Sequence, residues 1–460
     1  MGNQVSGAVE RLAHDSIYNP PPVKYARSSC RFTRTKAGDS IAMRLYSPDA
    51  LVEERFRSFA NAASPYDLLV FSHGNGADIG HVQHFCEHLR TALLMDVLVY
   101  DYPQYGHSST AQASESNMLA AIEAAEKSIG LCSYIFRADS AGQPFIDALI
   151  RAHKRGVQVR VLIDGIGGGY LWPGTYVRLR RAGVPVGRFL HSYWPWRTPF
   201  LNLRNHRKVM VVDGRIAFVG GINIGKENVL AASPAHPVRD VHFRLEGPVV
   251  EQLVESFADG WLFEKGETLS DERWFPPLQP AGAYEARAIP SGPDEDLEQI
   301  EFVALHAISC ARHSIRIVTP YYLPPDVLTT ALSLAAMRGL YVDIVVPEHS
   351  NYRVLDWARR VAFRELHQAG CRIWLRQGPF EHSKIMAIDN TWTMIGSANW
   401  DTRSFRLNFE LNVEVQGAEF AAQVDALVRT TRPLELAELN GDSLPLRLRN
   451  AAARLLTPYL

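Results

Sequence analysis

Three things are scarce in this 460-residue chain: long apolar runs, cysteine, and an excess of charge of either sign. We find no run of about 18 apolar residues, so no transmembrane helix is predicted. The five cysteines are far apart and odd in number, which indicates neither a metal cage nor a disulfide framework and fits a reducing compartment. The 48 Lys and Arg residues balance 49 Asp and Glu residues, which argues against nonspecific nucleic-acid binding.

The N-terminus lacks the apolar core of a secretory signal. Residues 1–6 instead match M-G-x-x-x-S, the pattern for myristoylation of Gly2. The alternative is a start codon followed by a polar tail. The length and the ordinary globular composition, with 47% hydrophobic residues, predict two or three domains that each bury a core.

The chain divides into three blocks and a linker rich in Pro, in the order block 1–115, block 116–265, linker 266–283 and block 284–460. The second and third blocks repeat one order of elements: a strand, a helix that ends in Arg-Gly, and a continuous apolar strand. The apolar strands are expected at 157–163 and 340–346. Helices that alternate with buried strands predict an α/β fold, with two similar α/β/α sandwich halves that form one shared site.

Each of these two blocks carries the motif H-x-K-x-x-x-x-D. Its residues form the candidate catalytic set: His206, Lys208, Asp213, His382, Lys384 and Asp389. The β-branched content predicts strands, in which His and Lys, two positions apart, point to one side. The Asp, at odd spacing from both, points away and is expected to anchor the following turn. Two copies, each followed by Gly-Gly/Ser-x-Asn, make the alternative of solvated side chains on a sheet face untenable.

These residue types fit phosphodiester chemistry. A neutral imidazole can attack phosphorus and form a phosphohistidine, while a second, protonated imidazole donates a proton to the leaving alkoxide. Two lysines and two asparagines can hold the non-bridging oxygens, so no metal or other cofactor is expected. An acidic partner for each imidazole would set its tautomer. The phosphate-binding and supporting candidates are Asn223, Asn399, Ser397, Asp240 and Glu410.

The two motifs resemble the signature of the phospholipase D superfamily, and the residues around them resemble its cardiolipin synthase branch. The matching segments are Asn205–Lys208, Gly220–Asn223, Ser291–Asp294, Thr319–Tyr322, Gly396–Ser404 and Asn408–Glu410. The resemblance covers residues 117–432. Two features depart from the family: many bacterial members open with two transmembrane helices, which are not found here, and the first block is foreign to it.

The resemblance implies that His206 is the nucleophile and that His382 is the general acid and then the base. It also implies a phosphatidyl-histidine intermediate, which a hydroxyl of phosphatidylglycerol resolves to give cardiolipin and glycerol. Sequence symmetry alone does not distinguish the two histidines, and the acceptor alcohol stays open. The alternative is a phospholipase D that passes the intermediate to water or another alcohol. A nuclease fits the balanced charge poorly. We therefore expect phospholipid, and not nucleic acid, as the partner. The oligomeric state stays open.

A phospholipid substrate requires membrane contact, and without a span we expect a peripheral protein on the cytoplasmic side. Aromatic residues beside Arg197, in residues 193–200, fit a docking loop or the mouth of an acyl groove, or else a loop packed on its own core. The leucines and arginines of residues 444–456 fit a basic amphipathic helix, with core or dimer packing as the favoured alternative.

The first block resembles the opening of a serine α/β-hydrolase over residues 66–109. A buried strand runs into an H-G-x-G loop at 73–76, and residues 97–108 resemble the next strand and turn. No nucleophile elbow follows, because Ser140, in A-x-S-x-G, lies in the second block's own strand-to-helix connection. We interpret this block as a partial hydrolase segment with a packing or interaction role; the less favoured alternative is a serine hydrolase that works through this block. Whether such a segment folds stably stays open, since its sheet edge needs covering.

Overall fold

The computed structural model describes residues 31–34, 40–46, 68–72, 85–87, 89, 96–100, 115–170, 174–191, 202–282, 284–418, 420–422, 432–440 and 442–455. The chain forms two compact units, Met1–Asn117 and Met118–Leu460, and each is described by itself. Gly2, the H-G-x-G loop at 73–76 and the aromatic segment at 193–200 lie outside the described residues.

The first unit contains a four-stranded mixed sheet in the order β1-β2-β4-β3. Its strands are β1 Arg31–Arg34, β2 Ser40–Tyr46, β3 Leu68–Ser72 and β4 Asp96–Tyr100. β3 and β4 pair in parallel, whereas β2 is antiparallel to β1 and β4. β3 and β4 coincide with the two strands expected in the hydrolase-like segment. The resemblance of this segment to a hydrolase stays a prediction.

The second unit consists of two halves. The first half contains a six-stranded sheet in the order β12-β10-β9-β5-β6-β7. Its strands are β5 Ser128–Ser133, β6 Gln158–Asp164, β7 Val186–Phe189, β9 Val209–Val212, β10 Ile216–Gly220 and β12 His242–Glu246. Its helices are α4 Glu115–Ala124, α5 Gly142–Lys154, α6 Gly174–Arg181 and α7 Val249–Lys265, with 3₁₀ turns η3 Lys226–Asn228 and η4 Leu230–Ala232.

Helix α5 shows why this half folds as it does. Phe145, Ile146, Leu149 and Ala152 recur at helical spacing and are buried. The helix ends at Lys154, and Gly156 just beyond it has a φ of 93°, which favours a residue without a Cβ. The chain then returns as β6, parallel to β5, as the Arg-Gly pattern predicted.

The second half contains a nine-stranded sheet in the order β13-β22-β20-β19-β14-β16-β17-β23, with β8 (Arg204–Asn205) joined to β22. Its strands are β13 Glu285–Ser291, β14 Ser314–Val318, β16 Tyr341–Pro347, β17 Arg372–Arg376, β19 Ile385–Ile388, β20 Trp392–Gly396, β22 Asn408–Gln416 and β23 Arg432–Pro433, and a separate parallel pair is β15 Tyr322–Leu323 with β21 Trp400–Asp401. Its helices are α8 Gln299–Cys310, α9 Asp326–Met337, α10 Arg353–Gln368, α11 Thr402–Arg406, α13 Leu436–Asn440 and α14 Leu444–Leu455.

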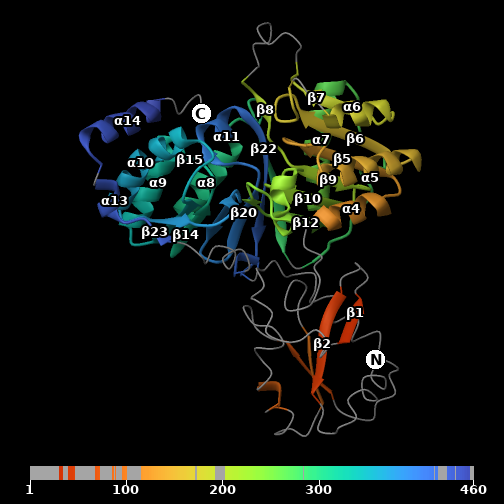
Figure 1. The fold of residues 1–460 in the computed structure, drawn as a ribbon, viewed down its shortest axis with the longest axis horizontal. Coiled ribbons are helices and arrows are strands. Elements are labelled where there is room, and N and C mark those ends of the chain that lie inside the picture. Colours follow the sequence, from red (N-terminus) through yellow and green to blue (C-terminus); the bar gives the residue numbers. More distant parts are fainter. Residues whose placement is uncertain are drawn as a thin grey trace. The chain divides into compact units, whose positions relative to one another are not determined.

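The two halves share one topology. The order β10-β9-β5-β6-β7 of the first half corresponds to β20-β19-β14-β16-β17 of the second, with parallel and antiparallel pairs at the same places. Figure 1 shows the halves side by side, with α5 and α6 on the outer side of the first and α8, α9 and α10 in the second. The prediction of two similar α/β halves is confirmed.

Two short parallel bridges join the halves. β8 (Arg204–Asn205) comes from the first half and pairs with β22, while β18 (Phe380–Glu381) comes from the second and pairs with β11 (Val238–Arg239). Each bridge lies directly before one motif histidine. The backbone N–H of His206 donates to the Phe409 carbonyl at 2.8 Å, and that of His382 donates to the Arg239 carbonyl at 2.7 Å.

One expectation about local structure was wrong. His206 and Lys208 lie in an extended segment between β8 and β9, not within a strand, and the corresponding residues of the second motif lie between β18 and β19. The described part of the expected linker, residues 266–282, packs on the first half: Trp274 is buried and stacks on Phe257 at 6.0 Å between ring centroids. Proline and polar residues there mark an irregular backbone that is nevertheless anchored by aromatic packing.

Among the described residues, we find no helix with the length and apolar character needed to cross a bilayer.

Candidate active site

His206 contacts an acidic residue of the opposite half. Both carboxylate oxygens of Glu410, on β22, lie 2.9 Å from its Nδ1. Glu410 is fully buried, and it also accepts hydrogen bonds from Ser397 Oγ at 2.6 Å and from Asn408 Nδ2 at 3.1 Å. Because the carboxylate accepts at Nδ1, the imidazole carries its proton there and presents the Nε2 lone pair.

His382, in the second half, contacts an acidic residue of the first half. Oδ2 of Asp240, which follows β11 in the first half, lies 2.6 Å from its Nδ1. Nζ of Lys384 lies 2.7 Å from the same nitrogen and 3.5 Å from the Asp240 carboxylate. The β11–β18 bridge brings Asp240 beside His382, as the β8–β22 bridge brings Glu410 beside His206. Each imidazole is therefore oriented by the half that does not contain it.

The two motif lysines are buried between these carboxylates. Lys208 donates from Nζ to the His206 carbonyl at 2.6 Å, and its ammonium lies 5.3 Å from the centroid of the Tyr134 ring. Lys384 donates to the His382 carbonyl. Burying two ammonium groups is costly unless anions compensate them, and Glu410 and Asp240 supply two negative charges.

The surroundings set the protonation states of this cluster. Burial lowers the pKa of both His206 and His382 to about 4, although the carboxylate beside each ring opposes the shift. Burial also lowers the pKa of Lys208 to about 7, and Glu410 opposes this. Burial alone would raise the pKa of Glu410, but His206 and Lys208 hold it below its usual value. The carboxylates are thus ionised and the imidazoles neutral.

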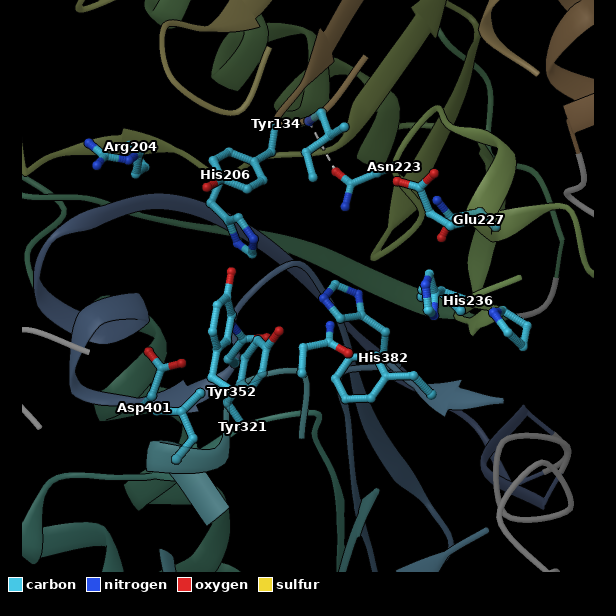
Figure 2. A pocket seen from close by; sticks show the side chains of 18 of the residues that line it. Tyr134, Arg204, His206, Asn223, Glu227, His236, Tyr321, Tyr352, His382 and Asp401 are labelled. Atoms are coloured by element: carbon cyan, nitrogen blue, oxygen red, sulfur yellow. Dashed lines mark hydrogen bonds between the residues drawn. The ribbon is translucent and has the colours of Figure 1, made fainter. Parts of the chain in front are cut away.

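The supporting residues divide into two groups. Asn223 accepts the Ile135 N–H through Oδ1 at 3.2 Å, and Figure 2 shows its amide nitrogen on the cavity side. Asn399 also lines the cavity. Ser397, predicted among the phosphate-binding and supporting residues, donates to Glu410. The corresponding residue of the first half is Gly221, where a Cβ would lie 2.3 Å from an Asp240 carboxylate oxygen.

The motif aspartates lie at the far ends of β9 and β19 from the histidines. Asp213 accepts the backbone N–H groups of Glu126, Lys127 and Ser128 at 3.0, 2.7 and 2.9 Å. Asp389 accepts the equivalent groups of Arg312, His313 and Ser314 at 2.8, 2.7 and 2.8 Å. The expectation that they point away from the histidines agrees with this geometry. They anchor the entrances to β5 and β14, however, and not the turns that follow them.

A cavity of about 1130 Å³ opens over the two histidines. One part of its lining is largely apolar and aromatic: Tyr321, Leu323, Tyr352, Val354 and Leu355. Another part is polar: Arg137, Lys226, Glu227, Asn228 and His236. Figure 2 shows Glu227 and His236 to one side of His382, and Tyr321 and Tyr352 to the other. An amphipathic molecule matches such a lining, with its polar end toward Glu227.

Sequence reasoning did not select several of these residues. Tyr134 packs edge-on against His206 with 4.8 Å between ring centroids, and Tyr321 packs edge-on against His382 at 6.2 Å. Tyr134 directly follows β5, and Tyr321 lies three residues after β14, the corresponding strand of the second half, so their repeated position was a usable signal. Asp401 also lines the cavity, and burial raises its pKa to about 6. Ser140, the apparent elbow serine, is an exposed residue before α5.

Comparison with known proteins agrees with this geometry. Residues 118–259 and 304–430 match the family model described as "Cardiolipin synthase, PLD-like domain". The chain belongs to this family. It is therefore an enzyme of the phospholipase D superfamily, and the resemblance read from the paired motifs is confirmed.

Curated cardiolipin synthases are similar to this chain over most of its length. A cardiolipin synthase of Geobacillus sp. (strain WCH70) is 35% identical over 75% of this chain and 70% of its own length. That of Alkalihalophilus pseudofirmus is 38% identical over 65% of this chain and 59% of its own. The major cardiolipin synthase ClsA of Bacillus subtilis (strain 168) is 35% identical over 75% of this chain and 72% of its own length. The chain thus spans about three fifths to three quarters of these relatives.

A solved structure agrees at the level of the fold. Phosphatidylserine synthase of Haemophilus influenzae Rd KW20 superposes with a TM-score of 0.59 over 75% of this chain and 93% of its own, at 16% identity. The two proteins therefore share the same overall fold over this part of the chain.

Proposed function

We propose that this chain is a cardiolipin synthase that joins two phosphatidylglycerol molecules into cardiolipin and releases glycerol. The observation that carries the proposal is the pair of crossed contacts, His206–Glu410 and His382–Asp240, at one cavity lined by apolar and polar residues. Family membership supports the same activity.

In the first step, Nε2 of His206 attacks the phosphorus of one phosphatidylglycerol. A P–N bond forms as the P–O bond to the headgroup glycerol breaks, and protonated His382 donates its proton to the departing alkoxide. Burial lowers the pKa of His382, but the negative phosphodiester bound beside it raises that pKa again. His382 can therefore hold the proton that it donates to the alkoxide. Lys208 and Lys384 stabilise the charge on the non-bridging oxygens.

In the second step, a headgroup hydroxyl of another phosphatidylglycerol enters where glycerol left. His382, now neutral, removes the hydroxyl proton, and the oxygen attacks phosphorus as the P–N bond to His206 breaks. Two molecules of phosphatidylglycerol therefore give one cardiolipin and one glycerol, and the enzyme returns to its starting protonation state. The same His382 serves as acid and as base, since Asp240 holds its ring in place throughout.

The lining of the cavity supports a lipid with a polyol headgroup. Glu227 accepts a hydrogen bond from Arg137 Nε at 2.9 Å and lies with His236 beside His382, where the departing and entering hydroxyls would lie. Carboxylate and imidazole groups bind vicinal hydroxyls well. The apolar lining accepts the glyceride portion of the lipid. We also propose peripheral association with the cytoplasmic face of a membrane.

Product analysis tests the proposal. Purified full-length protein is incubated with phosphatidylglycerol in detergent micelles, and the lipids are identified by mass spectrometry. Cardiolipin and glycerol in equal amounts are expected, and His206→Ala and His382→Ala are expected to abolish both. Phosphatidic acid without cardiolipin would instead identify a hydrolytic phospholipase D, and activity that depends on Ser140 would refute the assignment altogether.

A further inference from the structure

Helix α14 presents leucines on the face that points away from the protein. Leu444, Leu448 and Leu455 are 67, 63 and 80% exposed, whereas Asn450 and Ala453 are buried. Residues four and eleven positions apart lie on the same face of a helix, so the three leucines form one stripe. A helix that served only the core of its own domain would bury this stripe and expose the opposite face.

Specific contacts fix this orientation. The Arg449 guanidinium lies 4.5 Å from the centroid of the Trp357 ring on α10, and Arg454 Nη2 donates to Asp326 at 2.8 Å. Asn450 Nδ2 donates to the Asp442 carboxylate at 3.1 Å. The helix is therefore anchored through a small residue, an amide and two arginines, and its leucines are left outward.

One flank of the leucine stripe is basic. Arg447, three positions after Leu444, is exposed beside the stripe. An apolar stripe with an arginine beside it is the composition of a helix that lies in the surface plane of a bilayer. Anionic headgroups attract such an arginine.

The position of α14 links this surface to the cavity. Ala453 packs in one small cluster with Leu323, Leu355 and Ala358. Leu323 and Leu355 also line the apolar part of the cavity. Figure 1 shows α14 beside α10, the helix whose first turn supplies Leu355. A bilayer that receives α14 therefore lies close to the part of the cavity that suits a glyceride.

We propose that α14 docks the protein on an anionic phospholipid bilayer through Leu444, Leu448 and Leu455, with Arg447 meeting the headgroups. The proposal rests on the lipid substrate of the proposed function. A second copy of the chain is a poorer occupant, because three leucine side chains offer only a few hundred Å², well below the roughly 1,200 Å² of a stable protein interface.

Vesicle flotation of the full chain tests this docking. The variant replaces Leu444, Leu448 and Leu455 with Gln, which keeps side-chain length and helix propensity. A matched control replaces three other exposed apolar residues of the second half with Gln: Phe302, Leu334 and Met337, at 61, 56 and 73% exposure. On vesicles of phosphatidylglycerol and phosphatidylcholine, the α14 variant is expected to bind about 100-fold more weakly than wild type, because three apolar side chains no longer leave water. The control is expected to bind like wild type.

A second variant, Arg447→Glu, leaves the leucine stripe intact and guards against a folding defect in the triple variant. It is expected to weaken binding to vesicles that contain phosphatidylglycerol about tenfold or more, while binding to pure phosphatidylcholine changes little. Thermal unfolding checks the fold of every variant.

Unchanged flotation of both α14 variants would overturn the proposal. So would a wild-type dimer that the triple leucine variant converts to monomer while vesicle binding persists, since the stripe would then be a self-association surface. Turnover of phosphatidylglycerol in detergent micelles is measured in parallel. Absence of wild-type turnover there would contradict the proposed function, whereas loss of flotation alone addresses only α14.

Discussion

The crossed contact between His206 and Glu410 gives the sharpest prediction. In Glu410→Gln the side chain keeps its size, but the carboxylate that holds the Nδ1 proton of His206 is gone. The new amide can donate its own N–H to Nδ1, which moves the imidazole proton to Nε2. That nitrogen then has no lone pair with which to attack phosphorus.

The magnitude follows from this change of tautomer. The corresponding carboxylate-to-amide substitution in Ser-His-Asp enzymes lowers kcat by about 10⁴. We expect a loss of about 10³–10⁴ in kcat here, which corresponds to about 4–5 kcal/mol of transition-state stabilisation. Loss of Glu410 also removes the group that keeps the pKa of buried Lys208 from falling further, which adds to the defect. KM for phosphatidylglycerol changes little, since Glu410 lies behind His206.

The assay is steady-state kinetics with phosphatidylglycerol in detergent micelles, with lipid products quantified by mass spectrometry. A matched control is Glu414→Gln on the same strand, because Glu414 pairs with Arg287 and Trp392 away from the histidines. It is expected to keep wild-type kcat. A folded Glu410→Gln enzyme with a kcat loss below about tenfold would refute the tautomer argument.

Three further predictions concern stability, acid sensitivity and specificity. Asp389→Ala removes the acceptor of three backbone N–H groups. Denaturant melts should show that the free energy of unfolding falls by about 1–3 kcal/mol, while kcat stays nearly unchanged. A lower kcat with unchanged stability would contradict a structural role for Asp389. His206, His242 and His382 have pKa values lowered to about 4, so the unfolded chain binds more protons below pH 6.5 and stability falls from there toward pH 4. His242→Leu should reduce that slope, as urea melts at several pH values would show, and an unchanged slope would contradict it. Glu227→Ala should reduce the preference for glycerol over ethanol as acceptor about tenfold or more in competition assays, and an unchanged ratio would contradict headgroup recognition there.

The sequence predicted much of the fold because its signals were repeated. The Arg-Gly helix ends before β6 and β16, the continuous apolar strands, and the two copies of the motif each supported the other. The supporting carboxylates Asp240 and Glu410 were also identified as partners of the imidazoles.

The sequence could not predict that each carboxylate would contact the histidine of the opposite half. These contacts depend on two bridges of two residues each, β8–β22 and β11–β18, which are too short to leave a periodic pattern. The side on which Lys208 lies was inferred from strand alternation, but the residue precedes β9, so that rule did not apply. The contact of Ser397 with Glu410 likewise depends on where Glu410 lies in three dimensions.

The central claim is that the two motifs form one site in which His206 alone carries the phosphatidyl group. Rapid mixing with phosphatidylglycerol, quenching under basic conditions that preserve phosphohistidine, and peptide mass spectrometry would test it most directly. The account predicts at most one phosphatidyl adduct per chain, on the peptide that contains His206, and its disappearance in Glu410→Gln. An adduct on His382, two adducts per chain, or cardiolipin formation by a His206→Ala enzyme would contradict it.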